Sequence, residues 1–177
     1  MAALLFGGAA CAAELRVAIP EHDDLVLTVP EEWKAKVRTP RANLPPTIAM
    51  VSGTHNELMV LITPIWPARS LTGDMPGAEE IRNMVSGAAD IAKTKSLEDS
   101  LPLQEWRAPG MFGYYFSATD REPEPNGFKY LTQGAVGFRE LRITFTILVN
   151  GEAKALNERA LQVLGTMRRA PRRNTSS

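Results

Sequence analysis

The chain has two histidines, and each stands close to carboxylates in the sequence. His22 lies in the run Glu21 to Asp24 (EHDD), and His55 is two residues before Glu57. Imidazole and carboxylate groups bind zinc and carry out general acid–base catalysis, so these segments are the candidates for a small hydrolase or a metal-dependent enzyme. Adjacent side chains on a turn diverge, and a closed metal site would need ligands from elsewhere. The alternative is that both segments are ordinary polar turns.

Other enzyme motifs are absent from the sequence. No serine stands in a G-x-S-x-G turn, and no G-x-G-x-x-G or G-K-[ST] phosphate loop follows a predicted strand. His-x-Glu occurs in zinc deaminases, but those enzymes also need paired cysteines, which this chain does not have. We therefore predict no catalytic residues, no metal site and no cofactor.

The only cysteine, Cys11, lies in an uncharged apolar run at the start of the chain, MAALLFGGAACAA. This run is too short for a transmembrane helix, which needs about 20 apolar residues. Small residues alternate at its end, as signal peptidase requires, so residues 1–13 are predicted to be a signal peptide cleaved near Ala12 or Ala13. A typical signal peptide has a lysine or arginine before the run, and here there is none.

Two alternatives for this segment stay open. Residues 8–11 (GAAC) resemble a lipobox with glycine in place of leucine, which would make Cys11 a lipid anchor. A buried N-terminal helix or strand is the other alternative. Under the favoured interpretation the mature protein is periplasmic or secreted and has no cysteine. It therefore has no disulfides, thiol chemistry or cysteine-bound metal.

Charge is balanced overall but unevenly placed. The 20 lysines and arginines equal the 20 aspartates and glutamates in number, so no large net charge attracts nucleic acid. Four arginines lie close to the C-terminus, at positions 168, 169, 172 and 173. Residues 169–177 are predicted to be a disordered basic tail, with a contact to phosphate or to an acidic partner as the alternative.

A binding surface is the more plausible use of the remaining side chains. Tryptophan and arginine are enriched in the residues that dominate interface energies, and rigid folds often present such residues at strand ends and loops. Each tryptophan taken alone is more often a packing residue. Tyr114 and Tyr115 are adjacent in a predicted strand and must point to opposite faces. The predicted binding residues are Trp66, Arg69, Trp106, Arg107, Tyr115 and Arg121.

The pattern of apolar residues predicts two main helices and six to eight strands. Helices are expected at 76–96 and 152–168, and a short helical turn or irregular strand at 31–37. Strands are expected at 15–19, 25–29, 47–52, 58–65, 101–108, 113–119, 128–138 and 141–149. Residues 58–62 are apolar at every position, which is typical of a strand covered on both faces.

This order predicts one α+β domain over residues 14–168, a mostly antiparallel sheet packed by helices. The early pattern L-x-V-P-x-x-W (Leu27 to Trp33) and the G-Y-Y-F strand running into Gln133-Gly134 resemble the PsbP-like superfamily. The helix in mid-chain and the closing amphipathic helix add to the likeness, which covers residues 25–168. That superfamily includes extrinsic photosystem subunits, a Ran-binding nuclear-import factor and small bacterial exported proteins or lipoproteins.

The resemblance implies an α/β/α sandwich and a binding or accessory role without catalysis. We therefore expect an exported, non-catalytic protein that binds a protein or an envelope component, with no nucleic acid and no transmembrane span. The alternative is a periplasmic hydrolase or metal-dependent enzyme that uses His55 and Glu57 or the turn at 21–24.

Overall fold

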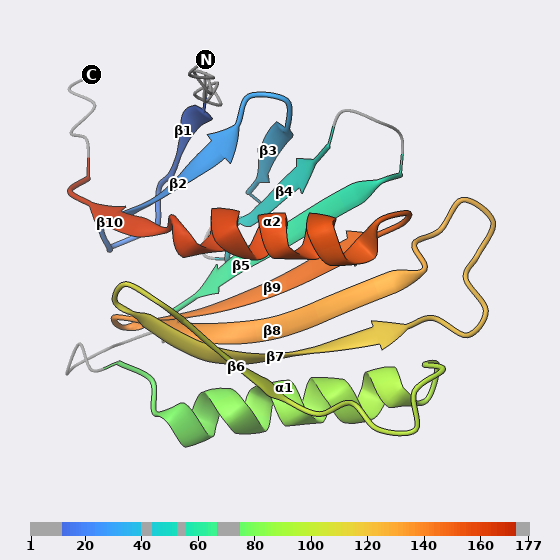
Figure 1. Ribbon diagram of the computed structural model, residues 1–177. Coiled ribbons are helices and arrows are strands. Elements are labelled where there is room, and N and C mark those ends of the chain that lie inside the picture. The colour runs from blue at the N-terminus through green and yellow to red at the C-terminus, as the bar shows by residue number, and fades with distance from the viewer. Residues whose placement is uncertain (1–11, 40–43, 53–55, 67–74, 173–177) are drawn as a thin grey trace, which may run out of the picture.

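The computed structural model describes residues 12–39, 44–52, 56–66 and 75–172, which form ten strands and two helices (Figure 1). The strands are β1 (Ala12–Val17), β2 (Asp24–Pro30), β3 (Lys34–Arg38), β4 (Thr47–Val51), β5 (Leu58–Ile65), β6 (Gln104–Ala108), β7 (Met111–Thr119), β8 (Tyr130–Phe138), β9 (Leu141–Val149) and β10 (Arg168–Ala170). The helices are α1 (Ala78–Lys93) and α2 (Ala153–Gly165).

The strands form two antiparallel sheets. Seven lie in the order β3-β4-β5-β9-β8-β7-β6, and a small sheet has the order β1-β2-β10. The predicted α+β class with a mostly antiparallel sheet is confirmed. The larger sheet, with seven strands, lies within the predicted six to eight, whereas the second sheet and its strand β10 were not expected.

Each face of the seven-stranded sheet packs against a different layer, as Figure 1 shows. On one face, α2 and the small sheet bury Ile143, Phe145 and Leu164 in the larger core cluster. On the other face, Ile81 and Val85 of α1 pack on Phe116 of β7 and the side chains around it. We call the face toward α2 the core face and the face toward α1 the α1 face.

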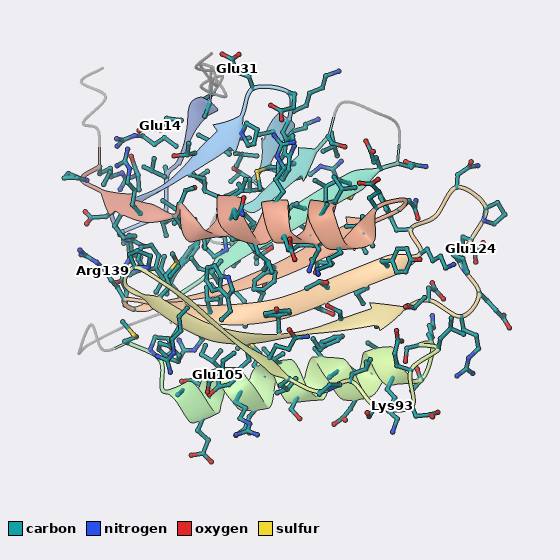
Figure 2. All side chains as sticks on the ribbon, in the orientation of Figure 1. Glu14, Glu31, Lys93, Glu105, Glu124 and Arg139 are labelled. Carbon is teal, nitrogen blue, oxygen red and sulfur yellow. The ribbon has the colours of Figure 1, made fainter. Side chains whose placement is uncertain are left out.

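Helix α1 forms where the apolar stripe predicted a helix at 76–96, and it ends at Lys93, three residues before the predicted boundary. Glu79 and Glu80 lie in its first turn and Lys93 in its last turn, where each charge suits the helix dipole. Lys93 is labelled at that end of the helix in Figure 2, where the other labelled charged side chains also lie on the outside of the molecule. Asp74, a candidate cap, lies outside the described residues.

Strand β10 corrects the predicted boundary of the tail. Arg169 and Ala170, expected to be disordered, pair with Leu25 and Asp24 of β2, and the Arg169 side chain is only 3% exposed. Three residues rich in arginine give no strand signal by themselves. Their pairing depends on an edge of β2 that only the folded chain provides.

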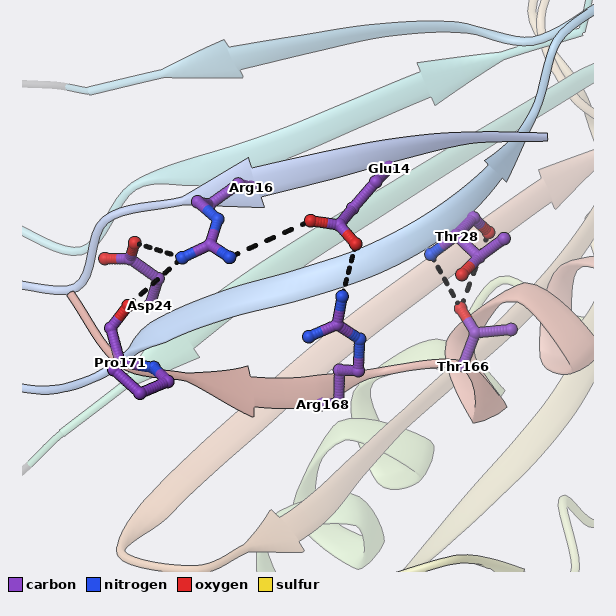
Figure 3. A network of polar contacts seen from close by, with 7 residues as sticks. All are labelled: Glu14, Arg16, Asp24, Thr28, Thr166, Arg168 and Pro171. Atoms are coloured by element: carbon purple, nitrogen blue, oxygen red, sulfur yellow. Dashed lines mark hydrogen bonds and ion pairs between the residues drawn. The ribbon is translucent and has the colours of Figure 1, made fainter. Parts of the chain in front are cut away.

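A chain of polar contacts holds the small sheet together (Figure 3). Arg16 of β1 donates to Asp24 of β2 and to the carbonyl of Pro171, both at 3.1 Å. Glu14 pairs with Arg168 of β10, so cations and carboxylates alternate across the three strands. At the end of α2, the Thr166 hydroxyl accepts from the Thr28 amide at 2.9 Å.

Strand β5 differs from the prediction that it is covered on both faces. Its core-face residues Leu58, Val60 and Ile62 are at most 1% exposed, but the residues between them are only half-buried. Helix α1 packs chiefly on β7 and β8 and leaves this part of the α1 face without a helix among the described residues.

Candidate functional site

The five predicted binding residues that the structure describes do not lie together in one site. Trp66 packs beside His22, with ring centroids 6.2 Å apart, while Trp106 and Tyr115 lie on the core face near the end of α2. Arg107 lies on the α1 face, Arg121 lies beyond the end of β7, and Arg69 lies outside the described residues.

The aromatic residues among them have structural contacts. Trp106 packs partly buried against the larger core, close to Gly165. Tyr115 donates from its hydroxyl to Gln104 Oε1 at 2.8 Å, and Tyr114 packs under α1 on the other face, as predicted. Arg107 pairs with Glu105 at 3.4 Å on the surface. A cleft of about 310 Å³ lies here, lined by Glu105, Trp106, Arg107, Tyr114 and residues around them.

Arg121 lines a separate cleft of about 360 Å³ with Lys95, Asp120, Glu122 and Glu124. Its guanidinium donates to the carbonyl of Ser96 at 2.8 Å, which ties the segment after α1 to the end of β7. This contact is a structural one. The cleft mixes both signs of charge and indicates no particular ligand.

The turn at 21–24 joins a polar corner of the core. His22 Nδ1 and the Arg169 guanidinium both lie 3.1 Å from Glu140 Oε1. Burial lowers the pKa of Arg169, and the nearby carboxylates of Glu140 and Asp23 oppose that change. Arg169 Nε and Nη1 and Asp24 Oδ1 are buried and have no hydrogen-bond partner among the residues that the structure describes. His22 therefore contacts a structural ion pair.

The second predicted pair, His55 and Glu57, is not placed as a pair, because His55 lies outside the described residues. Asn56 is tied to the loop before β8 by its side-chain amide, which donates to Asn126 O at 2.6 Å. Within the described ranges, no three histidine, cysteine or acidic side chains are grouped to hold a metal ion.

The feature that sequence reasoning missed is the part of the α1 face on which no described helix packs. Its floor, which we call the open face, consists of half-buried side chains from β4, β5 and β9 that alternate with the core residues. They are Ala49, Val51, Met59, Leu61, Thr63, Thr144, Thr146 and Leu148.

The open face is continuous because its residues are direct cross-strand neighbours. Val51 lies opposite Met59, and Met59 lies opposite Leu148. In the next row Ala49 lies opposite Leu61, which lies opposite Thr146. Side chains opposite each other on neighbouring strands are about 5 Å apart, so each row is a band of touching groups.

Helix α1 forms one wall of the open face. Glu80 pairs with Arg142 of β9, which places this flank of the helix along β9. Met84, Ala88 and Ile91 follow Glu80 at intervals of three and four residues and therefore lie on the same flank. Ile91 is 75% exposed although it is fully apolar. Beside the end of this flank, Ala92, Leu131 and Leu148 line a hollow of about 180 Å³.

Three cations form the opposite border. On β3, the three cations Lys34, Lys36 and Arg38 are the cross-strand neighbours of Val51, Ala49 and Thr47 on β4. Their side chains therefore point to the α1 face of the sheet, at the β3 end of its cross-strand rows. We call them the basic edge. All are exposed, and none forms an ion pair with another described residue, unlike Arg142, Arg159 and Arg168 elsewhere in the chain.

The comparisons with known proteins concern the fold. No family model and no curated protein matches the sequence. The structure is similar to the solution structure of cyanobacterial PsbP (CyanoP) from Synechocystis sp. PCC 6803, with a TM-score of 0.52 and 12% sequence identity. The match covers 93% of this chain and 96% of that chain. Neither described helix is long and apolar enough to cross a membrane. The chain has the PsbP-like fold that its sequence pattern indicates.

Proposed function

We propose that this chain is an exported, non-catalytic accessory protein that binds a partner protein on its open face. The observation that carries the proposal is the continuous floor of half-buried side chains, five apolar and three threonines, beside an exposed isoleucine, Ile91. Contiguous apolar surface of this kind marks interaction sites on soluble proteins. Closure of the face by a partner would place Leu61, Met59 and Leu148 in a dry interface.

Two further observations support the proposal. The PsbP-like fold agrees with the accessory role that the sequence resemblance implies. Of the two candidate catalytic segments only the turn at 21–24 is fully described, and its His22 contacts Glu140, which also pairs with Arg169. Export rests on the signal-peptide pattern of residues 1–13. The intact mass of the chain recovered from its host tests that part and separates cleavage near Ala12 from lipidation of Cys11.

Site-specific photo-crosslinking in the native host tests the binding site. A photoreactive residue replaces Ile91 in one variant and Lys154, an exposed residue of α2, in the control. We expect Ile91 to crosslink one protein in high yield and Lys154 not to do so. The purified pair should form a complex that Leu61→Asp weakens while the chain stays folded. Equal crosslinking from both positions would contradict the assignment of the open face.

The enzyme alternative has its own test. In a His22→Ala/His55→Ala variant we expect the complex and the biological phenotype to be retained. Loss of the phenotype with the complex intact would show that an imidazole does chemistry here and would overturn the non-catalytic proposal.

A further inference from the structure

We infer that the partner presents an acidic amphipathic α-helix, whose apolar side lies on the open face and whose carboxylates meet Lys34, Lys36 and Arg38. This inference rests on the proposed function and adds the chemistry of the partner. The position of α1, the dimensions of the floor and the charges on β3 carry it.

The position of α1 indicates a helix. One half of the α1 face is covered by α1, whose Ile81 and Val85 pack on β7 and β8. The other half is built from the same kind of side chains but has no described helix on it. A second helix lying beside α1 would cover β9 and β5 and would contact Met84, Ala88 and Ile91. It would complete the layer that α1 begins.

The dimensions of the open face agree with this occupant. From β3 to β9 there are three strand spacings, about 14 Å, and a helix with its side chains is about 10 Å wide. The hollow of about 180 Å³ beside Ala92 and Leu148 provides a recess at one end for a large apolar side chain of the partner.

The basic edge determines the charge of the partner. Lys34, Lys36 and Arg38 alternate along β3, so the first and last are about 13 Å apart at the rise of a strand. Carboxylates at positions i, i+4 and i+8 of a helix span about 12 Å. One edge of a helix can therefore face all three cations at once. No ion pair joins these three cations to another described residue.

The basic edge also has a second effect, because lysines on an edge strand discourage edge-to-edge aggregation. Replacing the cations with glutamates separates the two roles. The variant Lys34→Glu/Lys36→Glu/Arg38→Glu keeps three charges on the edge strand, so the edge stays protected against aggregation. Only the sign of the charge that faces the partner is changed.

The probe is a synthetic peptide of about four helical turns with leucines on one side and glutamates at i, i+4 and i+8 on the border of that side. The comparison peptides are the same helix with lysine in place of glutamate and a scrambled acidic sequence of identical composition. Binding is measured by fluorescence anisotropy at low and high salt, and peptide helicity by circular dichroism. Phosphatidylglycerol vesicles serve as the other anionic surface.

We expect the acidic helix to bind the wild-type chain about tenfold or more tightly than either comparison peptide, with weaker binding at high salt. The triple glutamate variant should lose that preference and bind the lysine peptide instead. Arg107→Glu/Lys154→Glu/Arg172→Glu, which changes the net charge equally at exposed positions away from the open face, should bind like the wild type. A reciprocal exchange of partners cannot come from misfolding.

Three results would overturn the inference. Equal binding of acidic and scrambled peptides would exclude an amphipathic helix, and equal loss in both triple variants would show an effect of net charge alone. If vesicles bound through the basic edge as strongly as the acidic peptide does, the occupant would be a lipid surface. If Ile91 still crosslinks one protein in the host, these results refute the acidic helix and leave the proposed function standing.

Discussion

The ring of Phe145 on β9 lies over Gly134 on β8, so close that a side chain at position 134 has no space. A Cβ there would be 2.5 Å from the ring and 2.5 Å from the carbonyl oxygen of Tyr114. The two residues are direct cross-strand neighbours in the core face. Close packing of Phe145 therefore explains why position 134, in the Gln133-Gly134 pair of the sequence pattern, is a glycine.

Gly134→Ala should destabilise the protein by about 2 kcal/mol, because the added methyl meets backbone as well as a ring and the core cannot yield locally. Gly87→Ala in α1 is the matched control, because a Cβ there meets nothing within 4 Å. It should stabilise the protein by about 0.5–1 kcal/mol through helix propensity. Urea unfolding of both variants measures these effects, and equal changes would contradict the packing argument.

Arg169→Met should destabilise the protein by about 3 kcal/mol, because the Arg169 side chain is 3% exposed and loss of its guanidinium leaves Glu140 without that cation. The double variant Arg169→Met/Glu140→Gln should lose less than the single variant, since both charges leave the corner together. Thermal unfolding of the two variants compares them. If the double variant were the less stable one, Glu140 would be stabilising the corner even without Arg169.

Glu98 gives stability that depends on pH. Burial raises the pKa of Glu98, but the Thr119 amide donates to both carboxylate oxygens and the pKa is lower than its usual value of 4.5. The carboxylate therefore stabilises the fold above the unfolded pKa, and this contribution is lost as pH falls below about 4.5 through the folded pKa.

Glu98→Gln should therefore destabilise the protein by about 1 kcal/mol at neutral pH. The difference from wild type should shrink as the pH falls through that range. Unfolding curves at a series of pH values provide the measurement. A difference that stayed constant down to the lowest pH would show that the charge of Glu98 is irrelevant.

Ile91→Ser should change the free energy of unfolding by less than about 0.5 kcal/mol, because the side chain is already exposed to water. Val85→Ser, at the buried side of the same helix, should cost about 2–3 kcal/mol. Complex formation should show the reverse order in variants that remain folded: Ile91→Ser weakens binding, and Val85→Ser leaves affinity close to wild type.

The regular elements were predictable where the sequence pattern and the packing agree. In β9, alternating Ile143, Phe145 and Ile147 predicted a strand with one buried face, and the structure places them in the core. The stripe of α1 was equally clear. Strand β10 was not predictable, because three residues that are two-thirds arginine become a strand only when β2 offers them an edge.

The candidate site was harder to predict because the type of a side chain does not indicate whether another element of the fold covers that side chain. Met59 and Leu61 are as apolar as the core residues on either side of them, so their sequence indicated burial on both faces. Whether they are covered depends on how far α1 reaches across the sheet, and that is a property of three-dimensional packing. Trp106 and Tyr115 were chosen by residue type alone, and the structure adds that both pack partly buried against the larger core.

The pairing of β2 with β10 has a consequence for when the protein can fold. Asp24 pairs with Ala170, so the small sheet cannot be completed until all the residues between them are available. Closing a loop of this size is slow compared with local folding. During synthesis, one edge of β2 therefore has no partner strand until β10 has been made.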